Sequence, residues 1–177
     1  MNKKISGVLA ALAIFVAAVF IVNPLTLQRP MSKILEADPR NDGIVVSAHY
    51  GNYLNPSELT FDLKEVSGSN SPADVSRVLF QYAEALQDRK FDQVIISYRG
   101  TQKFYFEGLY FQNLGKEYGT QNPVYTMRTL PENVFTRDGS AAFGTWTGGL
   151  LGVVGKQMED FNEFHKQWYL SEMSRGD

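Results

Sequence analysis

The chain contains two histidines, and one of them lies close to carboxylates. His165 follows Glu163 by two residues and Asp160 by five, whereas His49 lies in the first third of the chain. An imidazole beside a carboxylate can act as a general base or bind a metal ion, so His49, Glu163 and His165 are the candidates for a hydrolytic site. The pattern does not predict zinc, because two histidines without a motif such as His-Glu-x-x-His do not supply the three or four ligands that zinc needs.

His165 also fits a purely structural role. It falls on the apolar stripe of a helix that we expect over 148–170, where an imidazole is usually a hydrogen-bonded group at the edge of the core. Glu163 falls on the opposite, charged face of the same helix, which is typical of a solvated surface. We favour this structural interpretation over the catalytic one.

Other catalytic and cofactor chemistry has no motif in this sequence, and no cofactor is predicted. The chain has no cysteine, which excludes a thiol nucleophile and Cys-ligated metals. The glycine-rich run 149–156 resembles a phosphate loop, but the required glycine is replaced by Leu150 and the required Ser or Thr by Gln157. We expect Gly148, Gly152 and Gly155 to let another backbone pack close, with a dip of the neighbouring leucines and valines into a membrane surface as the alternative.

Aromatic side chains are dense between residues 98 and 146. Phe104 and Phe106 cannot share a strand face with Tyr105, because successive side chains of a strand point to opposite faces. Tyr105, Arg128 and Trp146 are the candidates for an exposed platform that binds a glycan or a peptide. Packing of these rings in the core is the interpretation that we favour.

Residues 5–22 form an uncharged stretch of eighteen residues whose only hydroxyl group belongs to Ser6. As a helix this stretch would be about 27 Å long, close to the thickness of the hydrocarbon core of a bilayer. We interpret residues 1–22 as an uncleaved membrane anchor, with a signal peptide cleaved near Ala18 as the alternative. Residues 23–42 contain three prolines and read as a linker.

The charges indicate where the remainder of the chain lies. Lys3 and Lys4 precede the apolar stretch and favour a cytoplasmic N-terminus, which places the rest of the chain in a bacterial periplasm, on the outer side of the inner membrane. Residues 30–177 carry 14 basic and 19 acidic side chains, so no nucleic-acid partner is expected.

The hydrophobic pattern of residues 43–177 predicts a single α+β domain. Strands are expected over 44–50, 58–66, 92–99 and 103–107, and helices over 72–89, 109–118 and 148–170. The second strand alternates cleanly, which predicts one buried and one wet face and hence an antiparallel sheet. Gly100-Thr101 is the expected hairpin turn. The predicted fold is therefore an antiparallel sheet of about four strands, packed by two or three helices.

Two stretches resemble a group of small bacterial envelope proteins of unknown function. They are residues 122–133 (NPVYTMRTLPEN) and residues 143–168, which begin FGTWTGGLLGVVGK. The resemblance covers mainly residues 72–169 and implies a bacterial origin and a self-contained domain. It carries no activity and no catalytic residue.

Two functions follow as hypotheses. The first is a membrane-anchored envelope protein, held in the inner membrane by residues 5–22, whose domain binds a protein or cell-wall partner without catalysis. The second is a periplasmic hydrolase with a site near His49, Glu163 and His165.

Overall fold

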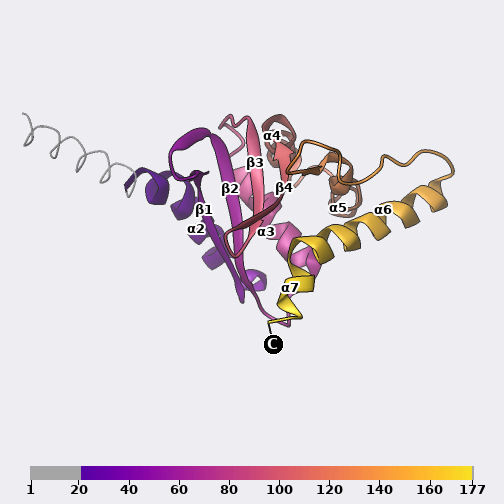
Figure 1. Ribbon diagram of the computed structural model, residues 1–177, viewed down its shortest axis with the longest axis horizontal. Helices are drawn as coiled ribbons and strands as arrows, with labels where there is room; N and C mark the ends of the chain where they lie inside the picture. The colour runs from indigo at the N-terminus through magenta and orange to yellow at the C-terminus, as the bar shows by residue number, and fades with distance from the viewer. Residues whose placement is uncertain (1–20, 177) are drawn as a thin grey trace, which may run out of the picture.

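The computed structural model describes residues 21–176 (Figure 1). The elements follow one another in this order: η1 (Pro24–Gln28), α2 (Arg29–Ala37), η2 (Pro39–Asn41), β1 (Ile44–Gly51), β2 (Asn55–Val66), α3 (Pro72–Ala85), β3 (Gln93–Tyr98), β4 (Thr101–Glu107), α4 (Gly108–Glu117), α5 (Pro123–Thr129), η3 (Leu130–Asn133), β5 (Phe135–Thr136), α6 (Leu150–His165), η4 (Lys166–Leu170) and α7 (Ser171–Met173). The α+β class is as the sequence predicts.

The sheet has five strands in the order β1-β2-β3-β4-β5, and it is mixed. All neighbours are antiparallel except β2 and β3, which are parallel. The prediction of an antiparallel sheet of about four strands is therefore wrong in two respects. Helix α3 crosses over between β2 and β3 and returns the chain to the end where β2 began, which makes the pair parallel. The two-residue strand β5 pairs with Phe104 and Tyr105 of β4, and so short a strand leaves no periodic signal in the sequence.

One face of the sheet packs against the helices and forms the core. Leu59, Phe61 and Leu63 of β2 are all fully buried there, as their alternation predicts. The prediction of a wet opposite face is wrong for β2, because Thr60 and Asp62 are only 6% and 2% exposed. β2 is an interior strand, and Thr60 lies in register between His49 of β1 and Ile95 of β3. Thr60 is shorter than both of these neighbours and loses its contact with water. The Asp62 carboxylate is instead paired with Lys64 and accepts from the backbone N–H of Gly100 at 2.9 Å.

Helix α3 begins where the sequence predicts. The hydroxyl oxygen of Ser71 accepts from the backbone N–H of Asp74, and the Asp74 carboxylate accepts from the backbone N–H of Ser71 at 2.8 Å, which is a capping box. The hairpin that follows is shifted by one residue from the prediction. Its turn is Arg99-Gly100, and both residues have positive φ angles of 49° and 85°, as a type I′ turn requires.

Residues 23–42 form a helical segment of the domain, which corrects the prediction of a linker. Leu27 and Met31 are fully buried in the core, and α2 lies beside β1 in Figure 1. The predicted anchor 5–22 lies almost entirely outside the described residues. Within residues 21–176, no helix has both the length and the hydropathy needed to cross a bilayer.

Backbones approach closely at Gly108, beside Phe91, and at Gly115, beside Ala83, which the sequence analysis did not single out. A Cβ atom on Gly115 of α4 would overlap the carbonyl oxygen of Ala83 on α3. Around Gly148, Gly152 and Gly155, by contrast, the described chain places no atom within 4 Å of such a Cβ atom. The expected close packing at these three glycines is therefore wrong. In Figure 1 the first turns of α6 extend away from the strands.

Candidate functional site

His165 lies inside the core, deeper than the edge position that the sequence suggests. Its side chain is fully buried, and its Nε2 atom lies 3.0 Å from the hydroxyl oxygen of Ser76 on α3. The rings of Phe161, Phe164 and Trp168 pack around the imidazole with centroid distances of 4.6 to 5.7 Å. Burial lowers the pKa of His165 to about 3, so the ring is neutral at physiological pH. A base enclosed in this way has no access to a substrate.

The other two candidates for a hydrolytic site lie elsewhere. Glu163 is on the surface of α6, where hydrogen bonds from Gln167 and Lys166 lower the pKa of its carboxyl group. His49 is on β1, and its ring stacks on Tyr53 with a centroid distance of 4.0 Å. His49 alternates with the buried Ala48, so it points to the face of the sheet away from the helices and from His165. The structure thus does not bring the three residues together, and no group of three potential metal ligands forms among the described residues.

The aromatic platform also divides into separate parts. Tyr105 is on the sheet face away from the helices and stacks on Phe135 at 5.4 Å, while Phe104 and Phe106 are buried on the core face. The opposite orientation of these neighbouring rings is as predicted. Tyr105 therefore does not share a surface with α5, which carries Arg128, or with α6, which Trp146 contacts.

Arg128 and Trp146 both contact α6. The guanidinium of Arg128 lies 4.9 Å from the centre of the Tyr125 ring and donates to the amide oxygen of Gln157. The indole N–H of Trp146 donates to Asp160 at 2.6 Å. The guanidinium of Arg128 and the indole N–H of Trp146 both have partners within the chain. The first attaches α5 to α6, and the second attaches to α6 the loop that precedes it.

A groove between α3, α4 and α5 is a concave site outside these candidates. Its volume is about 420 Å³, within the range of ligand and side-chain pockets. Phe80 and Leu114 are almost fully buried at its base, and Met127 of α5 adds to this apolar lining. Its exposed edge carries two groups of opposite charge, the guanidinium of Arg40 and the carboxylate of Glu117. The groove is therefore amphipathic, with an apolar interior and a charged rim.

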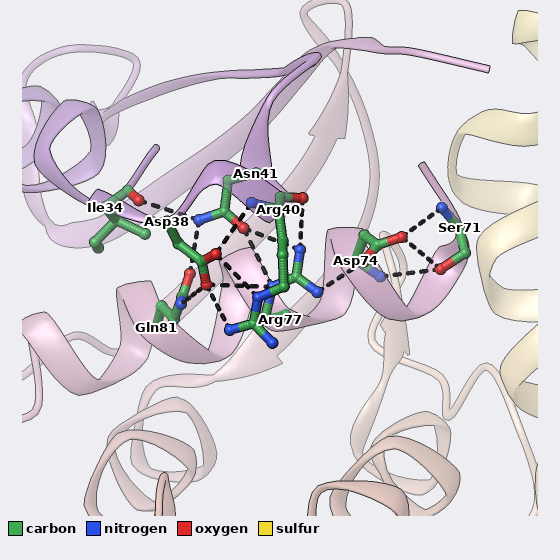
Figure 2. Close-up of polar contacts among 8 residues, drawn as sticks. All are labelled: Ile34, Asp38, Arg40, Asn41, Ser71, Asp74, Arg77 and Gln81. Carbon is green, nitrogen blue, oxygen red and sulfur yellow. Dashed lines mark hydrogen bonds and ion pairs between the residues drawn. The ribbon is translucent and has the colours of Figure 1, made fainter. Parts of the chain in front are cut away.

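A polar network fixes the wall of the groove that α3 and η2 form (Figure 2). Arg77 donates through Nη1 to Asp74 at 2.7 Å, and through Nη2 to the backbone oxygen of Arg40 at 2.7 Å and to Asn41 at 3.2 Å. Gln81 donates to Asp38 at 3.2 Å. These bonds join η2 to α3, so the wall is held by groups that are already satisfied and unavailable to a ligand.

Arg40 is the one residue named in this network whose side chain still has donors available to a ligand. Its Nε and Nη2 atoms both donate to Asp38, at 2.9 and 2.7 Å, and the hydrogen bond from Arg40 holds the pKa of the Asp38 carboxyl well below its usual value. The side chain is still 68% exposed, and a guanidinium that uses two of its nitrogens in one carboxylate pair retains donors on the third. Arg40 can therefore donate to a carboxylate or carbonyl oxygen of a bound chain.

The sequence analysis did not find this groove, because its lining comes from four separate segments. The lining segments meet only when α4 and α5 fold back over α3. They are residues 40, 73–80, 114–123 and 126–127. The one local signal is Gly119, whose φ of 81° ends the turn after α4 and directs the chain back towards α5.

Known protein families, characterised proteins and solved structures give no match to the chain. The resemblance of residues 72–169 to small bacterial envelope proteins therefore stays an expectation.

Proposed function

We propose that the chain is a single-pass protein of the bacterial inner membrane, anchored by residues 5–22, whose periplasmic domain binds a protein partner and does not catalyse a reaction. The groove between α3, α4 and α5 carries this proposal. Its apolar base suits one or two apolar side chains of a partner, and Arg40 at the rim suits a carboxylate or a backbone carbonyl beside them. The enclosure of His165, the exposed position of Glu163 on α6 and the position of His49 on the opposite face of the sheet favour binding over hydrolysis.

Site-specific photocrosslinking in native membranes tests the groove as a binding site. The full chain carries a benzophenone amino acid in place of Gln121 at the groove or, as the control, in place of Glu65 on β2; both side chains are exposed. We expect a defined protein adduct from position 121 and none from position 65. Equal labelling at both positions would contradict the proposal.

A pair of substitutions on α5 tests whether the adduct depends on the groove. Thr126 lines the groove, whereas Val124 is 58% exposed on the same helix and does not line it. Thr126→Arg fills the groove with a long charged side chain and is expected to abolish the adduct at position 121. Val124→Arg adds the same charge outside the groove and is expected to leave the adduct intact. An adduct that survives both substitutions does not come from groove binding.

A further inference from the structure

Exposed apolar side chains gather at the end of the domain where the described chain begins. Two segments contribute them, the first helical residues and the turn between β1 and β2. They are Ile21, Val22, Leu25, Tyr53 and Leu54, with exposed fractions between 43% and 56%. We call this set the apolar collar.

Asn23 joins the two segments into one surface. Its amide nitrogen donates to the backbone oxygen of Tyr53 at 2.8 Å, and its amide oxygen accepts from the backbone N–H of Tyr50 at 2.7 Å. Asn23 itself is only 5% exposed. The turn is therefore held against the helix, and the collar does not depend on a mobile loop.

Folding alone does not require an aromatic residue at the tip of this turn. Tyr53 has a φ of 64°, a left-handed conformation that favours Gly, Asn or Asp over a bulky side chain. Its ring stacks on His49, but more than half of the residue faces solvent, and Leu54 beside it is 55% exposed. A Tyr-Leu pair exposed in a strained turn is the composition expected of a contact with an amphipathic environment.

The residues on either side of the collar in the sequence point to a lipid surface. Residues 5–20, which precede it, contain no charged side chain. Arg29 and Lys33 follow it on α2 and are both exposed. Arg29 lies seven residues after Val22, about 10 Å further along a helix, which places the cations at the depth of lipid headgroups when Val22 lies at the edge of the hydrocarbon.

We propose that the apolar collar is a second membrane contact, in which Tyr53 and Leu54 enter the bilayer interface beside the anchor helix and fix the orientation of the domain on the membrane surface. This inference rests on the proposed anchoring of the chain by residues 5–22. Because Leu27 and Met31 bury the next helical turns in the core, the domain is attached rigidly and its β1–β2 turn reaches the same depth in every molecule.

The absence of cysteine from the chain allows a clean test. The full chain is labelled with an environment-sensitive fluorophore at Leu54→Cys or, as the control, at Val45→Cys, and placed in nanodiscs of phosphatidylethanolamine and phosphatidylglycerol with and without doxyl-labelled lipid. Val45 is 45% exposed and lies on the same strand as His49 but near its other end. We expect a blue-shifted emission and several-fold stronger quenching at position 54 than at position 45.

A further variant, Tyr53→Asp in the Leu54→Cys chain, is expected to reduce the quenching. Aspartate tolerates the positive φ, so the turn keeps its shape while a charge replaces the aromatic ring. Equal quenching at positions 54 and 45 in a chain that co-elutes with the nanodiscs would overturn the second contact alone. A chain that does not co-elute with the nanodiscs would overturn the anchor and the second contact together.

Discussion

At the scale of single residues, His165 makes the stability of the fold depend on pH. Burial lowers the pKa of the imidazole to about 3, against 6.5 for an exposed histidine. Between these two values the unfolded chain binds a proton that the folded chain does not, so the free energy of unfolding falls as the pH falls. We expect a loss of up to about 1.4 kcal/mol per pH unit below pH 6.5. Urea unfolding of the full chain in non-ionic detergent, followed by near-UV circular dichroism between pH 7.5 and 4.5, measures it.

One substitution assigns this dependence to the buried imidazole. His165→Gln keeps a polar group near Ser76 but cannot take up a proton, so the slope between pH 6.5 and 4.5 should flatten. A slope that persists in His165→Gln would show that another group causes it.

The same residue shows what a sequence can and cannot predict about a site. The spacing of apolar residues in 151–168 places His165 on the buried stripe of its helix, and the structure confirms that burial. Its partner Ser76 is 89 positions away on α3, within a stretch that shows only an ordinary amphipathic pattern. Local periodicity predicts which face of a helix is buried, but it does not predict which residue of another element that face meets.

At the scale of elements, the packing of α4 on α3 depends on Gly115. A Cβ atom there would overlap the backbone oxygen of Ala83, and a backbone atom in a packed helix cannot move aside as a flexible side chain can. We expect Gly115→Ala to lower the free energy of unfolding by about 3 kcal/mol, at the upper end for overpacked cores. Thermal unfolding of the full chain in detergent measures the change, and the groove between α3, α4 and α5 should lose its shape with it.

Gly155→Ala is the matched control on α6. The described chain places nothing within 4 Å of its added methyl group, and alanine favours the helix over glycine by about 0.8–1 kcal/mol. The same substitution should therefore stabilise the protein at position 155 and destabilise it at position 115. Destabilisation at position 155 would mean that a neighbour packs there after all.

The elements that the sequence predicts well are those with local signals. The start of α3 is predicted by three residues within one turn, Ser71, Pro72 and Asp74. The structure contains the capping box that Ser71 and Asp74 form. The parallel pairing of β2 and β3 has no such signal, because it depends on where α3 returns the chain. The burial of Thr60 follows from the same pairing, since only an interior strand has taller neighbours on both sides.

At the scale of the whole molecule, the prolines of residues 23–42 have a different meaning from the one that the sequence suggests. Pro39 is the first residue of η2, where the missing N–H of proline costs no hydrogen bond. Pro24 and Pro30 lie within a helical run that continues from residue 21 to residue 37, and Pro24 begins its π-helical turn, Pro24–Gln28. In isolation they are typical of a linker. The structure distinguishes the two cases by Leu27 and Met31, which are fully buried and thereby make this segment part of the core.

Gln28 connects this N-terminal helix to the edge of the sheet. Its amide oxygen accepts from the backbone N–H of Ala48 at 2.7 Å, and its amide nitrogen donates to the backbone oxygen of Val46 at 3.1 Å. β1 is an edge strand, so these groups would otherwise be open to pairing with another chain. We expect Gln28→Ala to lower the free energy of unfolding by about 1–3 kcal/mol, since it leaves both groups without a partner. Hydrogen exchange of the Ala48 amide in the full chain should become faster.

The exchange rate of the Ala48 amide in Gln28→Ala tests whether the N-terminal helix is fixed to β1. Gln87 is a half-buried glutamine in the turn that follows α3, and its side chain makes no hydrogen bond within the described residues. Gln87→Ala is therefore the matched control and should leave the exchange of Ala48 unchanged. If Gln28→Ala also leaves it unchanged, the helix is not fixed to β1 through this amide. If the exchange becomes faster, the N-terminal helix of the domain is fixed to the edge of the sheet through the side chain of Gln28.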